Sequence, residues 1–223
     1  VFGEPEFALL ERGPVRAVLR VTVRCGVSAV RRDYFLYAGD DALHVRMTVD
    51  FHEKHRALKL AFPVPGDVRA AIPFGSIVRA PGGGEEPCGA WLAAGPLGFA
   101  SDFGCGYDTA DGFIRPTVLR GAIYADHFGV RDEFCEYMEQ GEHEFEYTLF
   151  PFKSFADSEK KAQALNNQPT IVTETFHKGK LGTSYSGISV SKENIIVTAL
   201  KKHEDSDAIT LRCYESENRY TAA

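Results

Sequence analysis

Apolar and polar residues alternate along two stretches of this chain, and this period of two restricts the fold more than any other feature. In residues 15–23 the odd positions are apolar, and residues 43–51 repeat the pattern. Successive side chains of a strand point to opposite faces, so both stretches are predicted to be strands with one buried and one solvated face. A third strand is predicted at residues 34–37. The turn Gly39-Asp40-Asp41 that follows predicts a hairpin with the second stretch.

Further short strands are indicated by apolar, β-branched and aromatic runs. They cover residues 58–64, 77–79, 97–100, 114–119, 143–150, 170–175, 188–190, 195–200 and 208–214. One helix is predicted from Ser154 to about Asn166, with Ser154 or Asp157 as N-cap and Pro169 beyond its end. The Gly- and Pro-rich residues 81–106 are expected to form loops. Many short strands with one helix predict an all-β protein, a large β-sandwich.

The composition changes at the helix. Arg is the usual cation before it and Lys after it, and Asn166-Asn167-Gln168-Pro169 follows. We therefore expect a β domain in residues 1–152, a helical linker in residues 153–168 and a C-terminal β-sandwich segment in residues 169–223. This last segment stops soon after a strand and is expected to be incomplete.

Charge and cysteine content restrict the partners. The net charge is −6 and the arginines are spaced along strands, which argues against nucleic acid. No apolar run approaches the roughly 18 residues of a membrane span, so no membrane partner is expected. The five cysteines are irregularly spaced, without a CxxC pair or a Cys/His zinc pattern. They indicate reduced thiols and a cytoplasmic location.

Residue patterns alone assign no catalytic or metal site. His52-Glu53-Lys54-His55 is one residue short of HExxH, and on a strand the two imidazoles would face opposite ways. The alternating acids of residues 142–146 are typical of a solvated strand face, and no Gly-x-Ser-x-Gly elbow occurs. No pair of carboxylates can be assigned to glycoside hydrolysis.

Three features are candidate sugar contacts. One is a Gly-rich turn, residues 104–108, expected to present the ring of Tyr107 and the carboxylate of Asp108. Another is Arg120 at the end of a predicted strand, since a guanidinium can hold two hydroxyls. The third is the polar strand face formed by His44, Arg46, Asp50 and His52. Strand faces and turns carry the same residue types for solubility, so both interpretations stay open.

Several segments, in order, resemble the C-terminal region of family 38 α-mannosidases. Residues 50–64 resemble the family's D-W-x-E-x-H-K-L-L-K-x-x-F-P, and residues 71–79 its E-I-P-F-G-x-x-x-R. Residues 106–108 resemble Y-G-Y-D, residues 117–120 L-T-L-L-R, and residues 141–151 G-x-H-x-F-x-Y-x-L-x-P. Residues 195–201 and 209–214 are similar to its last β-sandwich.

The resemblance implies a galactose-mutarotase-like supersandwich in residues 1–152 and a smaller β-sandwich after the helix. It also implies a parent enzyme that hydrolyses terminal α-mannosyl residues with retention, using an Asp nucleophile and a zinc ion. In the family these groups lie in an N-terminal β/α barrel that the 223 residues do not contain. The chain is therefore expected to need no cofactor itself, to be inactive alone, to support the barrel as its partner, and to lend Arg120, Tyr107 and Asp108 to the α-mannoside pocket.

Two alternatives stay open. A stand-alone carbohydrate-binding module would suit the same sandwich. An aldose-epimerase-like enzyme on a mutarotase fold would need a His general acid, such as His44 or His52, and a nearby Glu base. The partial-enzyme interpretation instead predicts an exposed apolar patch where the barrel docks.

Overall fold

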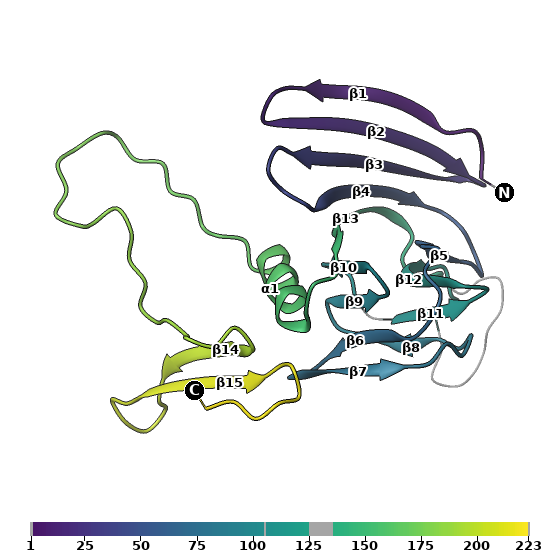
Figure 1. Ribbon diagram of the computed structural model, residues 1–223. Coiled ribbons are helices and arrows are strands. Elements are labelled where there is room, and N and C mark those ends of the chain that lie inside the picture. The colour runs from purple at the N-terminus through teal and green to yellow at the C-terminus, as the bar shows by residue number, and fades with distance from the viewer. Residues whose placement is uncertain (1, 105, 125–135, 223) are drawn as a thin grey trace.

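The structure is a computed structural model that describes residues 2–104, 106–124 and 136–222 (Figure 1). The all-β class predicted from the sequence is confirmed: these residues form fifteen strands and one helix. The strands are β1 (Glu6–Arg12), β2 (Arg16–Cys25), β3 (Ser28–Tyr37), β4 (Leu43–Phe51), β5 (Ala57–Lys59), β6 (Val68–Ile72), β7 (Gly75–Arg79), β8 (Glu86–Pro87), β9 (Trp91–Ala94), β10 (Leu97–Ser101), β11 (Gly106–Ala110), β12 (Phe113–Arg120), β13 (Gly141–Pro151), β14 (Ile195–Lys202) and β15 (Ile209–Glu215). The helix is α1 (Phe155–Asn166).

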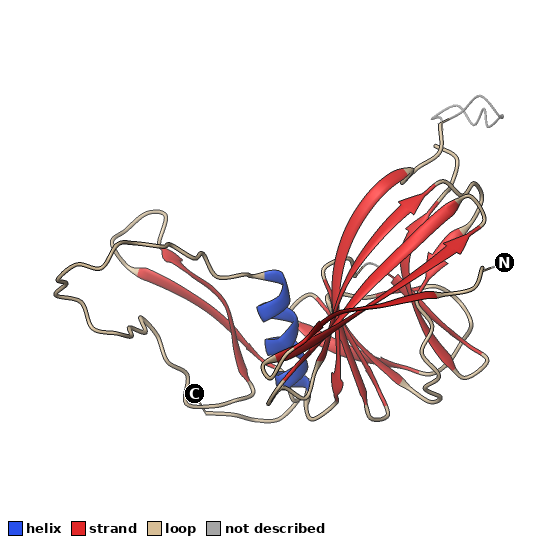
Figure 2. Ribbon diagram, turned by 90° about the horizontal axis from the view of Figure 1, so that it is seen from above, coloured by secondary structure: helices blue, strands red, loops and turns tan. Residues whose placement is uncertain are grey.

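Nine strands form the larger sheet, in the order β1-β2-β3-β4-β13-β10-β9-β6-β7. All its pairs are antiparallel, and β2, β3 and β4 follow one another as a meander. The predicted alternation places the odd residues of β2 on one face, together with their partners on β3. The sheet twists strongly, so that β1–β4 stand apart from β6 and β7 (Figures 1 and 2).

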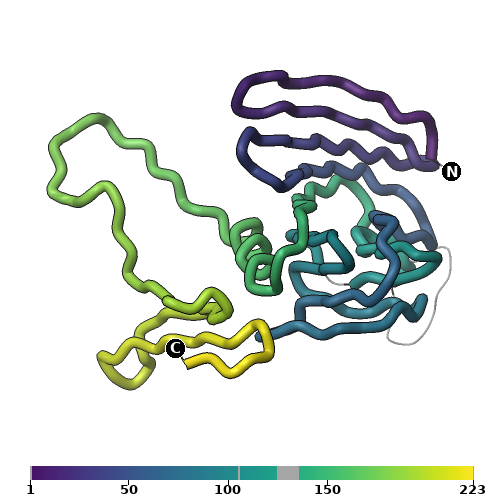
Figure 3. Tube along the Cα trace, viewed as in Figure 1, coloured from purple at the N-terminus to yellow at the C-terminus, as the bar shows by residue number. Residues whose placement is uncertain are grey.

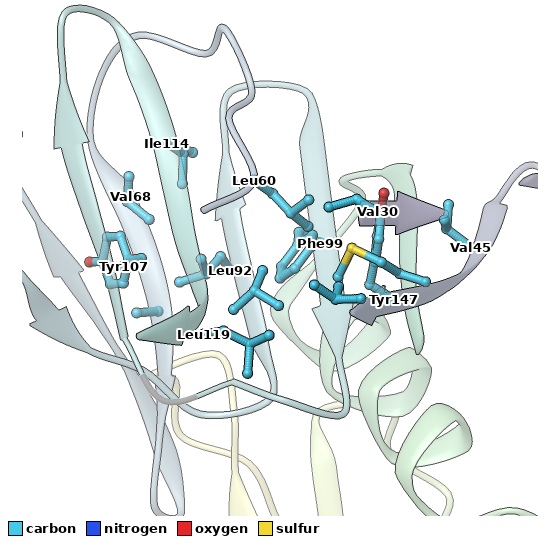
Figure 4. Packing of buried hydrophobic residues seen from close by; sticks show 14 of the residues in the cluster. Val30, Val45, Leu60, Val68, Leu92, Phe99, Tyr107, Ile114, Leu119 and Tyr147 are labelled. Atoms are coloured by element: carbon cyan, nitrogen blue, oxygen red, sulfur yellow. The ribbon is translucent and has the colours of Figure 1, made fainter. Parts of the chain in front are cut away.

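Four strands form the smaller sheet, in the order β5-β12-β11-β8. It packs against the larger sheet, and the main core fills the space between them (Figure 4). Both sheets contribute fully or nearly fully buried side chains, among them Met47, Leu92 and Phe99 from the larger sheet and Tyr107 and Ile114 from the smaller one. Two packed sheets make this part of the chain a sandwich. The finer assignment to a mutarotase-like supersandwich stays a prediction.

Helix α1 lies against the opposite face of the larger sheet, over β9 and β10 (Figure 1). It begins as predicted, because the Ser154 side chain accepts a hydrogen bond from the Asp157 amide at 3.1 Å. The ring of Phe155 stacks on Trp91, and the Arg69 guanidinium lies 3.6 Å from the centroid of the Phe155 ring. Ala162 completes a second buried cluster at this contact.

A long segment without helix or strand joins α1 to a terminal hairpin (Figure 3). The strands predicted at residues 170–175 and 188–190 are wrong, because this segment runs beside no strand to which it could pair, and a single extended chain gains no ladder hydrogen bonds. Its apolar side chains are exposed, including Phe176 and Leu181. The hairpin β14–β15 contacts the rest of the chain through Tyr214, whose ring packs on Phe74, and through Glu217, which accepts a hydrogen bond from the Ala156 amide.

Two other expectations need correction. Residues 81–106 were expected to form loops, but they contain β8 and β9 as well as the expected β10. Trp91 and its neighbours in β9 are buried, so apolar contacts outweigh the local Gly and Pro content. Of the strand expected at residues 58–64, only Leu58 and Lys59 belong to a strand, β5, whose register against β12 shifts between these two residues. Beyond it, Phe62 forms an isolated bridge with Ile114. The division into residues 1–152, 153–168 and 169–223 stays a prediction.

No helix in the described ranges has the length and apolar character that crossing a membrane requires.

Candidate functional site

Arg120 lies at the end of β12, on the wall of a groove of roughly 470 Å³. We call this hollow the Arg120 groove. Its lining residues come from the end of the β4–β5 loop, the start of β5, the end of β12 and the segment that follows it: His55, Arg56, Ala57, Arg120, Gly121, Ala122 and Ile123. Arg120 is exposed, and its backbone amide donates a hydrogen bond to the Glu139 carboxylate. The structure therefore places Arg120, one of the predicted sugar contacts, at an open, concave surface.

Two backbone segments meet closely beneath this groove. The His55 amide donates to the Gly121 carbonyl at 2.6 Å, and the Gly121 amide donates to the Arg56 carbonyl at 2.8 Å. A Cβ on residue 121 would lie 1.9 Å from the Glu53 carbonyl oxygen, so the crossing requires glycine. His55 has a φ of 55°, a left-handed conformation that is uncommon outside glycine. The groove is thus shaped by an unusual local backbone.

An aromatic side chain completes this site from a distant part of the chain. Tyr137 lies 82 residues from His55, yet its hydroxyl is 2.9 Å from His55 Nε2 and the two rings meet edge to face. The Lys54 ammonium lies 4.8 Å from the centroid of the same ring. Arg120, His55 and Tyr137 together offer a guanidinium, an imidazole and a phenol. All three groups can donate hydrogen bonds to a polyhydroxylated ligand, and the imidazole and the phenol can also accept them.

Sequence reasoning missed His55 and Tyr137 as members of this site. His55 was considered only as part of a metal motif, and Tyr137 lies in a segment with no assigned element. Tyr137 also forms an isolated backbone bridge with Ile123, outside the sheets. Both contacts of Tyr137 join residues that are distant in the sequence, so they leave no local pattern. Gly121 directly after Arg120 is the one signal that could have pointed to a close backbone contact.

Tyr107 does not lie on a turn. It belongs to β11, where it pairs with Pro116, and its side chain is 1% exposed within the core (Figure 4). The expectation that residues 104–108 present this ring to solvent is wrong, because pairing with β12 turns the ring into the sandwich. Burial raises the pKa of the Tyr107 hydroxyl, although the nearby Arg79 partly offsets it. Cys105, in the same segment, lies outside the described residues.

Asp108 points to the outer face of the smaller sheet, but the residue is only 5% exposed and both oxygens of its carboxylate are paired with cations. Lys59 Nζ lies 2.5 Å from one oxygen, and Arg115 Nε lies 2.5 Å from the other. Burial opposes ionisation, but these two donors outweigh it and hold the pKa of Asp108 below its usual value. Lys59 also binds Glu85, and the pKa of Lys59 is raised because these bonds outweigh the cost of its own burial.

The three predicted contacts do not converge. Asp108 pairs with Arg115, and Tyr107 pairs with Pro116, four to five residues before Arg120 along β12. At about 3.3 Å per residue this separation is roughly 13 Å or more. Arg120 is exposed at its groove, whereas Tyr107 is buried in the core. Asp108 lines a separate hollow, where Lys59 and Arg115 bind its carboxylate. Sugar binding by Tyr107 and Asp108 stays a prediction for which the structure offers no open group.

The polar strand face is held by internal pairs. His44 Nε2 lies 2.8 Å from Asp40 and its Nδ1 lies 3.2 Å from the Thr148 hydroxyl. His52 Nε2 lies 2.7 Å from Asp50, and Arg46 binds the Glu146 carboxylate. The hydrogen bond to His44 lowers the pKa of Asp40. Each histidine therefore pairs with an aspartate, in place of the glutamate base that an epimerase would use.

The residues described by the structure hold no group of three or more His, Cys, Asp or Glu side chains placed for a metal ion. His52 and His55 illustrate the reason, since one pairs with Asp50 and the other with Tyr137. The zinc that the family resemblance implies thus finds no fitting donor set in this part of the chain.

The fold defines a class: an all-β protein whose main body is a sandwich of two packed sheets. The model of the glycosyl hydrolases family 38 C-terminal domain matches residues 3–80, and that of the family 38 C-terminal β-sandwich domain matches residues 194–223. The chain is thus similar to the C-terminal region of family 38 proteins, and the resemblance predicted from the sequence is confirmed.

Individual proteins agree with this assignment. α-Mannosidase G of Dictyostelium discoideum is 27% identical over 237 aligned residues, which cover 93% of this chain and 20% of that protein. Two structures from Enterococcus faecalis, one of a protein in glycosyl hydrolase family 38 and one of an α-mannosidase, share the fold with TM-scores of 0.79 and 0.78. They are 17% and 16% identical, and each match covers 95% of this chain and 30% of the other. The chain thus spans less than a third of each of these relatives.

Proposed function

We propose that this chain is the C-terminal, non-catalytic β region of an α-mannosidase, an enzyme that hydrolyses terminal α-mannosyl residues. The observation that carries the proposal is the ordered match of two family 38 C-terminal domains, at residues 3–80 and 194–223. Relatives that are named α-mannosidases are three to five times longer, since the chain covers only 20% to 30% of them. The nucleophile, the zinc ion and its ligands are assigned to the part of such a protein that lies outside these residues.

In this proposal the chain supports the catalytic domain and shapes one wall of its sugar pocket. Arg120 is the proposed contact, because its side chain is exposed at a groove that also holds His55. A guanidinium can donate to two adjacent hydroxyls, and Tyr137 beside His55 offers a further polar and aromatic surface. The partners are an α-mannoside and the catalytic domain of the same polypeptide.

The proposal also places the protein in the cytoplasm. Its five cysteines are odd in number and irregularly spaced, which favours reduced thiols over a disulfide framework. Separation of cell fractions, with detection of the full-length protein in each, tests this location.

Hydrolysis of a chromogenic α-mannoside tests the function. The full-length protein, with zinc added, is expected to release the chromophore, and this chain alone is expected to release none above a heat-denatured control. Turnover by the chain alone would place the active site within these 223 residues and overturn the proposal. Binding of mannosides by the isolated chain without turnover would instead favour a carbohydrate-binding module.

A further inference from the structure

The larger sheet extends beyond the smaller sheet that covers it. Strands β1 and β2 and the end of β3 project past the core, as Figure 1 shows. Their inward face carries large apolar side chains that remain open: Phe7 is 66% exposed, Leu9 61%, Leu36 57% and Leu19 38%. We call these four residues and their neighbours on that side the open face.

The open face is a direct continuation of the buried core. Leu9 pairs with Leu19, Leu19 with Tyr34, Tyr34 with Val45, and Val45 with Tyr147. Paired residues share one side of a sheet, so these five form a single row across five strands. The row is exposed at Leu9 and only 2% exposed at Val45 and Tyr147. The smaller sheet thus covers the row only at Val45 and Tyr147 and leaves its apolar end at Leu9 exposed.

The reverse side of the same strands carries charged side chains. Arg20 binds Asp33 through two hydrogen bonds of 2.6 Å there, and Arg31 donates to the Thr48 hydroxyl. A sheet with one charged face and one apolar face normally buries the apolar one. Contiguous exposed apolar surface of this kind marks a contact site.

The groove over the open face is bordered by the edge of the smaller sheet. Its volume is roughly 930 Å³, and Leu58, Leu60 and Phe62 line it beside the residues of β1–β3. Strand β5 is the end strand of its sheet, with β12 as its partner. The amides of Leu60 and Phe62 donate toward β12, to the carbonyls of Pro116 and Ile114.

Amides alternate in direction along a strand, so those of Lys59 and Ala61 point to the other edge, toward the groove. An edge of this kind is a template for a further strand. Extension of β5 would lay new strands over β1–β3, whereas extension of β1 would widen the larger sheet and leave its face uncovered.

The side chain of Arg32 restricts which segment could cover the open face. Arg32 lies on the open face between Val21 and Met47 in register. Its Nε is buried and has no hydrogen-bond partner among the described residues. Arg32 also lines the groove, so a segment that covers this face would bury its charged guanidinium further. Such a segment is expected to bring a carboxylate or carbonyl oxygen to that guanidinium.

We infer that a segment of the longer polypeptide, outside these 223 residues, adds one or more strands to the free edge of β5 and covers the open face. This inference rests on the proposed place of the chain in a longer enzyme, because most of each relative lies outside the matched region. The added strands complete the second layer of the sandwich. Their inward side chains are apolar, apart from the acceptor for Arg32.

The full-length protein tests this inference through two separate measurements. Thiols introduced by Leu19→Cys and, separately, Leu36→Cys are labelled with a maleimide, and mass spectrometry follows the rate at each position. Val27→Cys is the control, since Val27 is 74% exposed in the turn between β2 and β3. Labelling at positions 19 and 36 is expected to be at least tenfold slower than at 27. In the unsubstituted protein, the amides of Lys59 and Ala61 are expected to resist hydrogen exchange.

Three results would overturn the inference. Labelling at 19 and 36 as fast as at 27 would mean that the face is open in the full-length protein. Slow labelling with rapid exchange at Lys59 and Ala61 would mean that something other than an added strand covers it. Cross-linking of Leu19→Cys between two chains would identify a second copy as the cover. An α-mannosidase assay on the same protein reports separately on the proposed function.

Discussion

The indole Nε1–H of Trp91 donates a hydrogen bond of 2.7 Å to Oε2 of Glu159. Trp91 belongs to β9 and is 2% exposed, while Glu159 belongs to α1. The bond therefore joins the larger sheet to the helix through a buried donor. Trp91 is also the single tryptophan of the chain, so its fluorescence reports on this contact without interference.

Glu159→Ala is expected to lower the free energy of unfolding by about 1–3 kcal/mol, because the buried indole donor loses its acceptor. Urea unfolding followed by Trp91 fluorescence measures the change. Glu159→Gln keeps an acceptor oxygen and is expected to lose less. Lys160→Ala, at an exposed position of the same helix, is the control. Equal stabilities for Glu159→Ala and Lys160→Ala would show that the bond contributes nothing.

Asp108 is expected to make the protein sensitive to acid. Its folded pKa lies below the unfolded value because Lys59 and Arg115 bind its carboxylate. The ionised form therefore adds stability that is complete above the unfolded pKa, about 3.9, and is lost as pH falls through the folded pKa. Asp108→Asn is expected to cost about 1–3 kcal/mol at pH 7 and to reduce the decline in stability below about pH 5.

Unfolding in urea at several pH values between 7 and 3 measures this effect. Asp207→Asn is a matched control, because the Asp207 side chain is fully exposed. Its stability profile is expected to follow that of the unsubstituted protein. An Asp108→Asn profile with the same acid-induced decline as the unsubstituted protein would contradict the proposed role of the network.

Local patterns predicted the elements that depend on local chemistry. The alternation in β2 and β4 reflects one wet and one dry face, and Ser154 satisfies a helix amide within three residues. Both features depend only on residues that are neighbours in the sequence, so they could be predicted. The order of the strands could not, since β13 lies between β4 and β10 through contacts that span much of the chain.

The candidate site shows the same limit. Tyr107 follows Gly106 in a Gly-rich segment, and only its pairing with Pro116 shows that its ring enters the core. Tyr137 meets His55 across 82 residues. Arg120 was predicted because it ends an apolar strand and its guanidinium can hold two hydroxyls, which are local features. Burial and long-range pairing decide which candidate remains available to a ligand.

Gly121→Ala is expected to distort the Arg120 groove. The new Cβ would lie 1.9 Å from the Glu53 carbonyl oxygen, which is backbone and cannot turn aside. Overpacking of this kind costs about 1–3 kcal/mol. Thermal unfolding measures the loss, and Gly84→Ala is the control because a Cβ at residue 84 meets nothing within 4 Å. Equal melting temperatures for the two variants would mean that the crossing of residues 53 and 121 can relax freely.

Arg120→Ala in the full-length protein is expected to lower kcat/KM for a chromogenic α-mannoside by roughly tenfold to a hundredfold. This is the size expected when hydrogen bonds from a charged donor to the substrate are lost. Folding should be unaffected, because the bond to Glu139 uses the backbone amide of Arg120 and survives the substitution. Arg120→Lys keeps the charge without the planar fork, so it is expected to recover only part of the activity.

Arg24→Ala is the control for this experiment, since Arg24 is exposed on β2, in the larger sheet, and does not line the Arg120 groove. Circular dichroism and the melting temperature establish that each variant is folded. If Arg120→Ala and Arg24→Ala both keep the kinetic constants of the unsubstituted enzyme, Arg120 does not contact the sugar. If only Arg120→Ala loses activity, a residue of this β region acts in a pocket whose catalytic groups come from another domain, because charge removal alone leaves Arg24→Ala active.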